Sequence, residues 1–339
     1  MRGPHSSLSI SDFPPSGLRL SPTCSTHVPL STSGPLSAPN VSASRKDTMP
    51  TVVTAIAALR ETLSTARRTA GAEGASDAPA SRVVLVPTMG ALHEGHVRLV
   101  NHARDLGGIV VVSIFVNPLQ FGSGEDLDRY PRTLDADVAL LDGLADIVFT
   151  PTAAEMYPRG ESSTRVTAGA VGGLLEGVSR PGHFDGMLTV VAKLFGIAQP
   201  DVAVFGQKDA QQVYLVGRMV DDLNLPVTIA VVDTVREPDG LALSSRNRYL
   251  DADARAAAAT LSRALADGAA ASAGGAAAVL TAARARVKAE PVVRLDYLVI
   301  VDQSTFREVA PNHHGPALLL IAACVGSTRL IDNERITLP

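Results

Sequence analysis

The sequence predicts an α/β protein: a doubly wound, parallel-sheet (Rossmann-like) domain over residues 49–235, followed by a smaller α+β domain over residues 236–339. Continuous apolar runs such as Val83–Val86 and Ile109–Val116 are typical of parallel strands that are buried on both faces. A segment of helical length, Gly95–Leu106, separates them and reads as the crossover of a βαβ unit. The second domain is indicated by a change to Ala-rich sequence after the first.

The predicted elements of the first domain alternate along its length. Residues 51–68 carry apolar side chains at helical spacing, and a linker rich in Gly, Ala and Ser follows at residues 69–81. After the first βαβ unit we expect a helix near 133–143, a strand at Ile147–Phe149, a helix near 186–198, a strand at Val202–Phe205, a helix near 210–223 and a strand at Val227–Val232. This alternation favours a doubly wound sheet.

The second domain is predicted to contain helices followed by antiparallel strands. Residues 252–289 are Ala-rich and helical in pattern, with an interruption at Gly274 and Gly275. Residues 295–301 and 317–323 have the composition of strands. Ligands of such architectures bind beyond the carboxyl ends of the parallel strands, often in a cleft between domains, so the motifs that carry chemistry should meet there.

The composition excludes several classes of function. The net charge of −4, the aromatic content of 4% and the absence of Trp oppose a nucleic-acid binder. Two distant cysteines, Cys24 and Cys324, argue against a disulfide framework and a cysteine-rich zinc site. No apolar run reaches the roughly 18–20 residues that a membrane helix needs. We therefore expect a cytoplasmic protein with no membrane partner.

Residues 1–48 differ from the rest of the chain, because they are rich in Ser, Pro, Thr and Gly and lack a sustained hydrophobic period. We expect a disordered N-terminal extension, or an upstream artefact of start-site choice with Met49 as the natural beginning. A transit peptide is the alternative, although the basic residues of the segment mark out no amphipathic helix.

The stretch Pro87–His96 places two histidines directly behind a buried strand, at the start of a helix. Gly90 lets the chain turn sharply, and Gly95 lets a ligand approach the backbone closely. A helix start offers free N–H groups and a positive dipole end, which suit phosphate. His93 and His96 lie on one helical face and could donate hydrogen bonds to it. The alternatives are two surface histidines or a weak metal pair.

The same stretch resembles the H-x-G-H element of the nucleotidyltransferase superfamily, in the form carried by the pantothenate synthetase (pantoate–β-alanine ligase) family. Further motifs match in the same order along the chain, and these are Phe115–Phe121, Arg180–Gly186, Phe205–Gln212 and Leu243–Asn247. Together they cover roughly residues 50–335. Five collinear motifs are far more specific than any one of them.

The resemblance implies an ATP-dependent ligase that acts in two steps. ATP and pantoate would give pantoyl adenylate and pyrophosphate. The amine of β-alanine would then attack the acyl carbon and give AMP and pantothenate, a precursor of coenzyme A. The resemblance also implies dependence on Mg²⁺ and a homodimer.

Two glutamines are expected to hold the acid substrate. Gln120 follows the second apolar strand and offers both a donor and an acceptor, as a hydroxy acid requires; a polar turn after a strand is the alternative. Gln212 lies four residues after Lys208, so the two share a face if the segment is helical. By resemblance Gln120 and Gln212 bind pantoate, and Gln120 also binds β-alanine.

Lys208 follows a buried strand through Gly206 and is a point charge suited to phosphate. A strand-end lysine that points to solvent is the alternative. Asp209 is expected to contact the ribose or to order the neighbouring lysine. Where the family usually has an aromatic residue, this chain has Ala210, which puts the local packing in doubt.

The stretch Asp239–Asn247 is predicted to be a mobile polar loop at the domain junction. Ser244 and Ser245 can donate to phosphate, and Arg246 can neutralise the triphosphate as pyrophosphate leaves. An interdomain hinge is the other interpretation, and the two are compatible because a closing hinge excludes water from an acyl adenylate. The family usually has Met at the position of Leu243, a nearly volume-conserving difference.

The predicted site is summarised by role. The catalytic residues are His93, His96, Lys208 and Arg246. The ATP-binding residues are Met89, Gly90, His93, His96, Asn117, Gly206, Gln207, Lys208, Asp209, Val235, Leu243, Ser244, Ser245 and Arg246. Asp137 could reach Mg²⁺, although a solvated helix start is the more common role of such a residue. His183 is a plausible adenylate contact by resemblance, or a capping or packing residue.

Two other functions fit parts of the pattern. A nucleotidyltransferase that moves AMP or CMP onto a phosphorylated acceptor would favour added Arg or Lys where this chain has the neutral Gln120 and Gln212. An inactive nucleotide-binding protein is opposed by the presence of all the principal polar residues. His96 is expected to act as a hydrogen-bond donor to phosphate rather than as a proton donor, because pyrophosphate is already a good leaving group.

Overall fold

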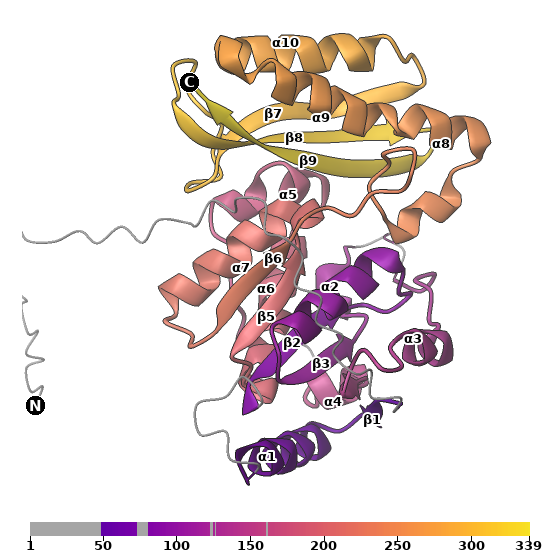
Figure 1. The fold of residues 1–339 in the computed structure, drawn as a ribbon, viewed down its shortest axis with the longest axis vertical. Coiled ribbons are helices and arrows are strands. Elements are labelled where there is room, and N and C mark those ends of the chain that lie inside the picture. Colours follow the sequence, from indigo (N-terminus) through magenta and orange to yellow (C-terminus); the bar gives the residue numbers. More distant parts are fainter. Residues whose placement is uncertain (1–48, 73–80, 123–124, 126, 161) are drawn as a thin grey trace, which may run out of the picture. The chain divides into compact units, whose positions relative to one another are not determined.

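A six-stranded parallel sheet forms the first part of the protein in the computed structural model (Figure 1). Its strands are β1 (Thr51–Val53), β2 (Val83–Thr88), β3 (Ile109–Ile114), β4 (Ile147–Phe149), β5 (Val202–Gly206) and β6 (Thr228–Val232), in the order β1-β4-β3-β2-β5-β6. The structure describes residues 49–72, 81–122, 125, 127–160 and 162–339, so the predicted extension 1–48 and most of the predicted linker lie outside the described residues. All strand pairs of this sheet are parallel.

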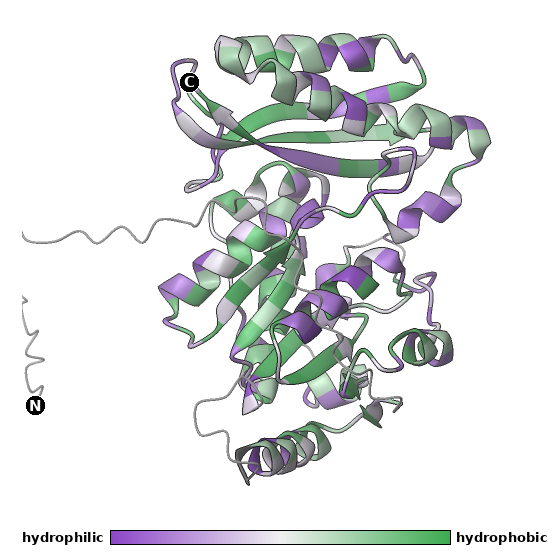
Figure 2. Ribbon diagram, in the orientation of Figure 1, coloured by the Kyte–Doolittle hydropathy of each residue, from purple (hydrophilic) through white to green (hydrophobic). Residues whose placement is uncertain are grey.

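Helices cover both faces of this sheet. One face packs on α1 (Ile56–Ala72), α6 (His183–Ala198) and α7 (Ala210–Asp222), and the other on α2 (Glu94–Asp105) and α3 (Leu134–Leu140). Shorter helices are α4 (Ala153–Met156), α5 (Glu176–Ser179) and the 3₁₀ turns η2 (Pro118–Gln120), η3 (Val171–Gly173) and η4 (Gln207–Asp209). The continuous apolar strands follow from this arrangement, because their side chains are buried alternately on both faces. Figure 2 shows these strands among the most hydrophobic segments.

The second part is a three-stranded antiparallel sheet with helices on one face (Figure 1). After η5 (Ser245–Tyr249) come the helices α8 (Ala252–Ala258), α9 (Thr260–Ala270) and α10 (Gly275–Lys288), with η6 (Ser272–Gly274) before α10. The strands are β7 (Val293–Asp302), β8 (Gly315–Val325) and β9 (Thr328–Leu338). One face of the sheet packs on α9 and α10, and the other packs on Ala210 at the start of α7 through Phe306 and Leu320.

The fold class predicted from the sequence is confirmed. The other predicted strands and helices occur near their expected places, but the helix predicted over residues 51–68 begins at Ile56 and runs to Ala72, into the predicted linker. Strands β1 and β9 are not predicted by the sequence. Ala210, whose packing was in doubt, is buried against Phe306 and the β8 residues Leu318 and Leu320. Among the described residues no single helix is long and apolar enough to cross a membrane, and one bent pair, 252–270 with 272–288, meets the criterion by length and composition only.

Candidate active site

The sheet order places two loops at a switch point. Strand β2 has β3 on one side and β5 on the other, so the chain leaves the centre of the sheet in opposite directions at the carboxyl ends of β2 and β5. A cavity of about 260 Å³ lies there, where ligands of open α/β sheets bind. The predicted site residues that line it are Met89, His93, His96, Gln120, Gly206, Lys208, Asp209, Gln212, Val235, Leu243, Ser244, Ser245 and Arg246.

The loop between β2 and α2 is held from below by Asp137. Gly90 and Ala91 both have a positive φ, of 81° and 50°, so the chain turns sharply after β2. The Asp137 carboxylate accepts hydrogen bonds from the amides of Ala91 and Leu92, at 3.0 and 2.8 Å, and from the Thr133 hydroxyl. Asp137 is buried, with 3% exposure, and does not line the cavity. The Asp137 carboxylate therefore positions the loop, and its geometry does not support a role as a Mg²⁺ ligand.

The two histidines of this loop cap helix α2 reciprocally. Nδ1 of His93 accepts from the amide of Gly95 at 3.1 Å, and Nδ1 of His96 accepts from the amide of His93 at 3.3 Å. Both rings are therefore neutral tautomers with the proton on Nε2, so each retains one N–H donor beyond the cap. Since both residues line the cavity, the pair can offer donors to an anion there.

Burial and nearby cations keep both imidazoles uncharged. Burial, followed by the charges of Lys208 and Arg248, lowers the pKa of His93. Burial, followed by His93, lowers the pKa of His96 to about 3. At neutral pH His96 is therefore a hydrogen-bond donor without a net charge, and the positive charge of the cavity comes from Lys and Arg side chains.

Gly95 makes room for the ring of His93. A Cβ atom at position 95 would lie 2.9 Å from Cε1 of His93 and 3.0 Å from its Nδ1. The sequence predicts that this glycine permits the close approach of a ligand; what the structure shows is that it permits the histidine cap.

The backbone at Gln120 is built around the buried Asn117. Nδ2 of Asn117 donates to Oε1 of Gln120 and to the carbonyl oxygen of Gly186, at 3.0 and 3.1 Å. Its Oδ1 accepts from the hydroxyl of Tyr157 at 2.7 Å. Because Asn117 is only 1% exposed and is saturated by these partners, it orients Gln120 rather than lining the cavity. Gln120 Nε2 in turn lies 3.1 Å from the sulfur of Met89.

His183 also supports Gln120 from behind. Its Nδ1 is 2.8 Å from the carbonyl oxygen of Gln120, so it donates that proton, and its Nε2 accepts from Arg180 at 3.2 Å. Burial and the charge of Arg180 lower the pKa of His183. Arg180 is also paired with Glu125. Of the two roles considered for His183, this geometry favours packing against the backbone, although the residue also lines the cavity.

The turn after β5 carries Lys208 to the cavity and turns Gln207 away from it. Gln207 is buried, and its side chain bonds to Asn333 and Arg335 of β9. Lys208 lines the cavity, and its Nζ lies 4.0 Å from Oδ1 of Asp209. Lys208 therefore provides a cation for an anionic ligand, whereas Gln207 links the turn to the second sheet.

The loop after β6 closes the opposite wall. The amide of Leu243 donates to the carbonyl oxygen of Val235 at 2.9 Å, which holds the outgoing and returning segments of the loop together. Ser244 caps η5 by accepting from the amide of Arg246 at 3.2 Å. Arg246 is exposed and, among the described residues, its guanidinium has no ion-pair partner. It lines the 260 Å³ cavity and a larger neighbouring one of about 950 Å³.

Residues 51–335 match the family described as Pantoate-beta-alanine ligase. The chain belongs to the pantoate–β-alanine ligase family. The Pantothenate synthetase of Leifsonia xyli subsp. xyli is 93% identical over 287 residues, which cover 85% of this chain and 100% of that protein. The Pantothenate synthetase of Streptomyces coelicolor is 51% identical over 306 residues, covering 76% and 91%.

Solved structures of this family have the same fold. The crystal structure of pantothenate synthetase from Thermus thermophilus is 45% identical, with a TM-score of 0.74, and covers 84% of this chain and 98% of that one. The pantoate–β-alanine ligase of Francisella tularensis, complexed with beta-gamma ATP and β-alanine, is 31% identical, with a TM-score of 0.66, and covers 84% and 97%. These findings confirm the family, the fold class and the ligase activity on pantoate and β-alanine that the motifs predict.

Several residues that shape this ligase site were not among the predicted ones. Tyr157 and Gly186 hold Asn117, and Arg180 contacts the carbonyl oxygen of Gln120 at 3.4 Å. Arg180 and Gly186 lie in one of the five collinear motifs, so their signal was present in the sequence. Asn333 lies on the unpredicted strand β9, and no sequence motif pointed to it.

The carboxylates near the cavity do not form a metal cage. No group of three His, Cys, Asp or Glu residues is placed to hold a metal ion among the described residues. Asp209 and Asp233 line the cavity as separate carboxylates on different loops. This donor set fits Mg²⁺ only as an ion that arrives with substrate phosphates, because Mg²⁺ is commonly held by one or two carboxylates together with phosphate oxygens and water.

Proposed function

We propose that this ligase works through a pantoyl adenylate, formed from ATP and pantoate with release of pyrophosphate and then attacked by the amine of β-alanine. The observation that carries the proposal is the convergence of neutral amides, N–H donors and cations on one cavity at the switch point. The complex of the Francisella relative with beta-gamma ATP and β-alanine supports these two ligands for the present chain.

The acid substrate is assigned to the amide side of the cavity. Gln120 and Gln212 both line it, and neither carries a charge that would favour a phosphorylated acceptor. Their donors and acceptors suit the carboxylate and hydroxyl groups of pantoate. Holding the carboxylate near the α-phosphate of ATP contributes to the rate through proximity, because the reaction within the complex no longer requires an encounter. Gln120 is also assigned to β-alanine.

The nucleotide is assigned to the loops after β2, β5 and β6. The Nε2–H groups of His93 and His96 donate to phosphate oxygens, and Lys208 and Arg246 balance the charge that grows as pyrophosphate leaves. Val235 and Leu243 line the same cavity with apolar side chains and would contact the base. Because the pKa of His96 is about 3, its contribution is hydrogen bonding rather than proton transfer.

Mg²⁺ is proposed to enter with ATP, with Asp209 or Asp233 as the carboxylate nearest to the phosphates. Bound there, it would neutralise phosphate charge during the first step. We further propose a homodimer in the cytoplasm, as expected from the sequence.

The decisive experiment measures pyrophosphate and AMP separately. Pyrophosphate release should require ATP and pantoate but not β-alanine, and AMP release should require β-alanine as well. Pyrophosphate release that is independent of pantoate, or an adenylylated product that persists with β-alanine present, would contradict the proposal and favour a nucleotidyltransferase.

The role of His96 is tested by comparing the two half-reactions. His96→Ala should slow adenylate formation far more than attack of β-alanine on preformed pantoyl adenylate. His102→Ala is the matched control, because His102 lies in the same helix α2 but does not line the cavity. Equal slowing of both half-reactions by His96→Ala would defeat the assignment.

A further inference from the structure

We propose that Asn333 is a positioning residue for Lys208: its side-chain amide, carried on β9, fixes the turn from which the lysine projects. The inference rests on the proposed function, because it takes Lys208 to be a ligand of the triphosphate. Asn333 follows Lys208 by 125 residues, so the second sheet would set the geometry of a site that the first sheet builds.

The amide of Asn333 is used completely on this one turn. Its Nδ2 donates to the carbonyl oxygens of Gln207 and Lys208, at 2.9 Å each, and its Oδ1 accepts from Nε2 of Gln207 at 3.0 Å. Two acceptors face the nitrogen and one donor faces the oxygen, so a flipped amide would leave all three groups unsatisfied. Asn333 is 3% exposed, which means that water cannot replace these bonds.

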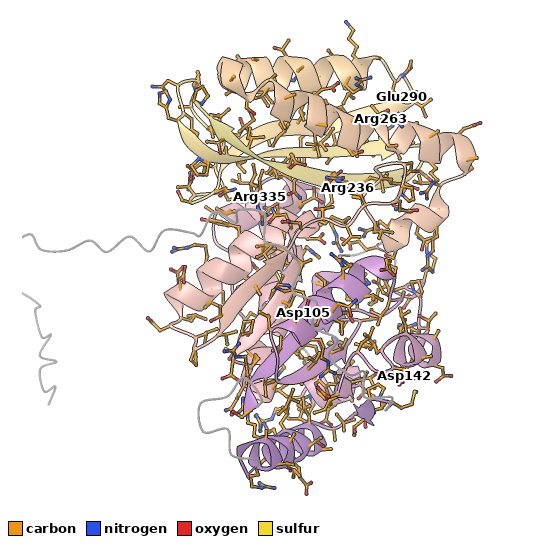
Figure 3. All side chains as sticks on the ribbon, in the orientation of Figure 1. Asp105, Asp142, Arg236, Arg263, Glu290 and Arg335 are labelled. Atoms are coloured by element: carbon orange, nitrogen blue, oxygen red, sulfur yellow. The ribbon has the colours of Figure 1, made fainter. Side chains whose placement is uncertain are left out.

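The turn lacks a comparable anchor of its own. It is the three-residue 3₁₀ turn η4, and neither η4 nor the following helix α7 begins with a side-chain cap. A second residue of β9 strengthens the attachment: Arg335 donates to Oε1 of Gln207 at 2.7 Å and to Oδ1 of Asp233 at 2.5 Å. Figure 3 labels Arg335 on the side of the second sheet that faces the first part. Strand β9 thereby ties the turn after β5 to the end of β6.

The side chain of Lys208 depends on this backbone for its position. Among the described residues its only ion-pair partner is Asp209, at 4.0 Å on the same turn. A shift of the turn therefore moves the ammonium group, and no other contact with a carboxylate in the described part of the chain would hold it in place. A misplacement of about 1 Å can cost about 100-fold in rate when a charge must meet a reacting group.

The test separates the half-reactions in the variant Asn333→Ala. We expect kcat/KM for ATP in pantoate-dependent pyrophosphate release to fall by about 10-fold or more. Attack of β-alanine on preformed pantoyl adenylate should change by less than about 2-fold, because pyrophosphate has already left and no triphosphate is bound in that step. In a double-mutant cycle, Asn333→Ala should add little to Lys208→Ala, since both remove the same interaction.

A matched control removes a different hydrogen bond between the second sheet and the first part of the protein, at helix α5. Tyr297→Phe on β7 deletes the hydrogen bond from its hydroxyl to Oε1 of Glu176, 2.8 Å long, without touching the turn that carries Lys208. It should leave the ratio of the two half-reactions at the wild-type value. A similar change of that ratio in Tyr297→Phe would show general loosening and overturn the inference.

Three other results would also overturn it: equal slowing of both half-reactions by Asn333→Ala, full additivity with Lys208→Ala, or unchanged kinetics. If Asn333→Ala does not fold, Asn333→Ser, which keeps one donor, is measured against the same outcomes. Wild-type protein that releases no pyrophosphate with pantoate would contradict the proposed function itself. If wild-type protein releases pyrophosphate with pantoate and Asn333→Ala does so at the same rate, only the inference about Asn333 is contradicted.

Discussion

Gly186 offers a direct test of how the acid-binding amide is positioned. The residue lies in the first turns of α6, where the helix passes against the backbone of η2. A Cβ atom built on Gly186 would lie 2.0 Å from the carbonyl oxygen of Leu119 and 2.7 Å from the amide nitrogen of Gln120. Gly186→Ala must therefore displace backbone, because no side-chain rotation can relieve these contacts.

The size of the displacement follows from those distances. The Leu119 oxygen would have to retreat by about 1.4 Å to reach an ordinary contact of 3.4 Å from the new methyl group. The hydrogen bond from Asn117 to the Gly186 carbonyl, 3.1 Å long, would be strained by the same movement. Overpacking of this kind typically costs about 1–3 kcal/mol in stability. Because Gln120 moves with its turn, we expect kcat/KM for pantoate to fall by about 100-fold.

The assay is pantoate-dependent pyrophosphate release at varied pantoate and at varied ATP, together with urea unfolding. Gly196→Ala in the same helix is the matched control, because Gly196 is exposed and a Cβ there meets no atom within 4 Å. That substitution should raise stability by about 0.5–1 kcal/mol and leave the kinetics unchanged. The reasoning is refuted if Gly186→Ala keeps the wild-type kcat/KM for pantoate. It is also refuted if KM for ATP changes by as large a factor as kcat/KM for pantoate.

Three further predictions concern the loop after β2. Gly95→Ala should push the ring of His93 out of its cap and raise KM for ATP, which initial-rate kinetics would measure. The pKa of His96 falls to about 3 in the folded protein, so as the pH drops below about 6.5 the unfolded chain binds a proton at His96 that the folded chain does not, and the free energy of unfolding decreases. His96→Gln should make this decrease shallower by up to about 1.4 kcal/mol per pH unit, measured by urea unfolding at pH 4.5–6.5. Asp137→Ala should lower the free energy of unfolding by about 1.5–3 kcal/mol, since the amides of Ala91 and Leu92 lose a charged acceptor. The same substitution should leave the Mg²⁺ concentration for half-maximal activity unchanged.

Each of these predictions has an outcome that would count against it. An unaltered KM for ATP in Gly95→Ala would mean that the cap does not place the histidine for phosphate. If the free energy of unfolding depends on pH in the same way in wild type and in His96→Gln, then folding does not lower the pKa of His96. A higher Mg²⁺ requirement in Asp137→Ala, with stability preserved, would restore this carboxylate as a metal ligand.

The first sheet was predictable from sequence because its signal is local. Strands β2, β3, β4 and β5 are continuous apolar runs, and helices follow β2, β3 and β5 along the chain, so the alternation indicates a parallel sheet. The collinear motifs then placed most of the site residues, since loops at the carboxyl ends of such strands converge. Strand β1 escaped prediction because it has three residues, of which two are exposed.

Strand β9 could not be predicted for a different reason. Its middle carries Asp332, Asn333, Glu334 and Arg335, which read as a charged turn between two apolar pairs. Asp332 and Asn333 are nevertheless buried, because Asp332 accepts from Arg236 and Asn333 binds the turn that follows β5. Such polar burial is stable only with partners that lie far away in the sequence. Hydrophobic periodicity cannot reveal such distant partners. For the same reason the sequence places Gln207 among the ATP-binding residues, although its side chain bonds to Asn333 and Arg335 of β9.

The three histidines of the site show how hydrogen-bond partners decide a role that residue type leaves open. Both nitrogens of His183 are taken by Gln120 and Arg180, so this ring supports the backbone. His93 and His96 each use Nδ1 as an acceptor in the helix cap and keep one N–H for the cavity. Burial lowers the pKa of all three rings. With neutral histidines as donors, permanent charge must come from Lys208 and Arg246, and such a site can stabilise a leaving pyrophosphate without moving a proton.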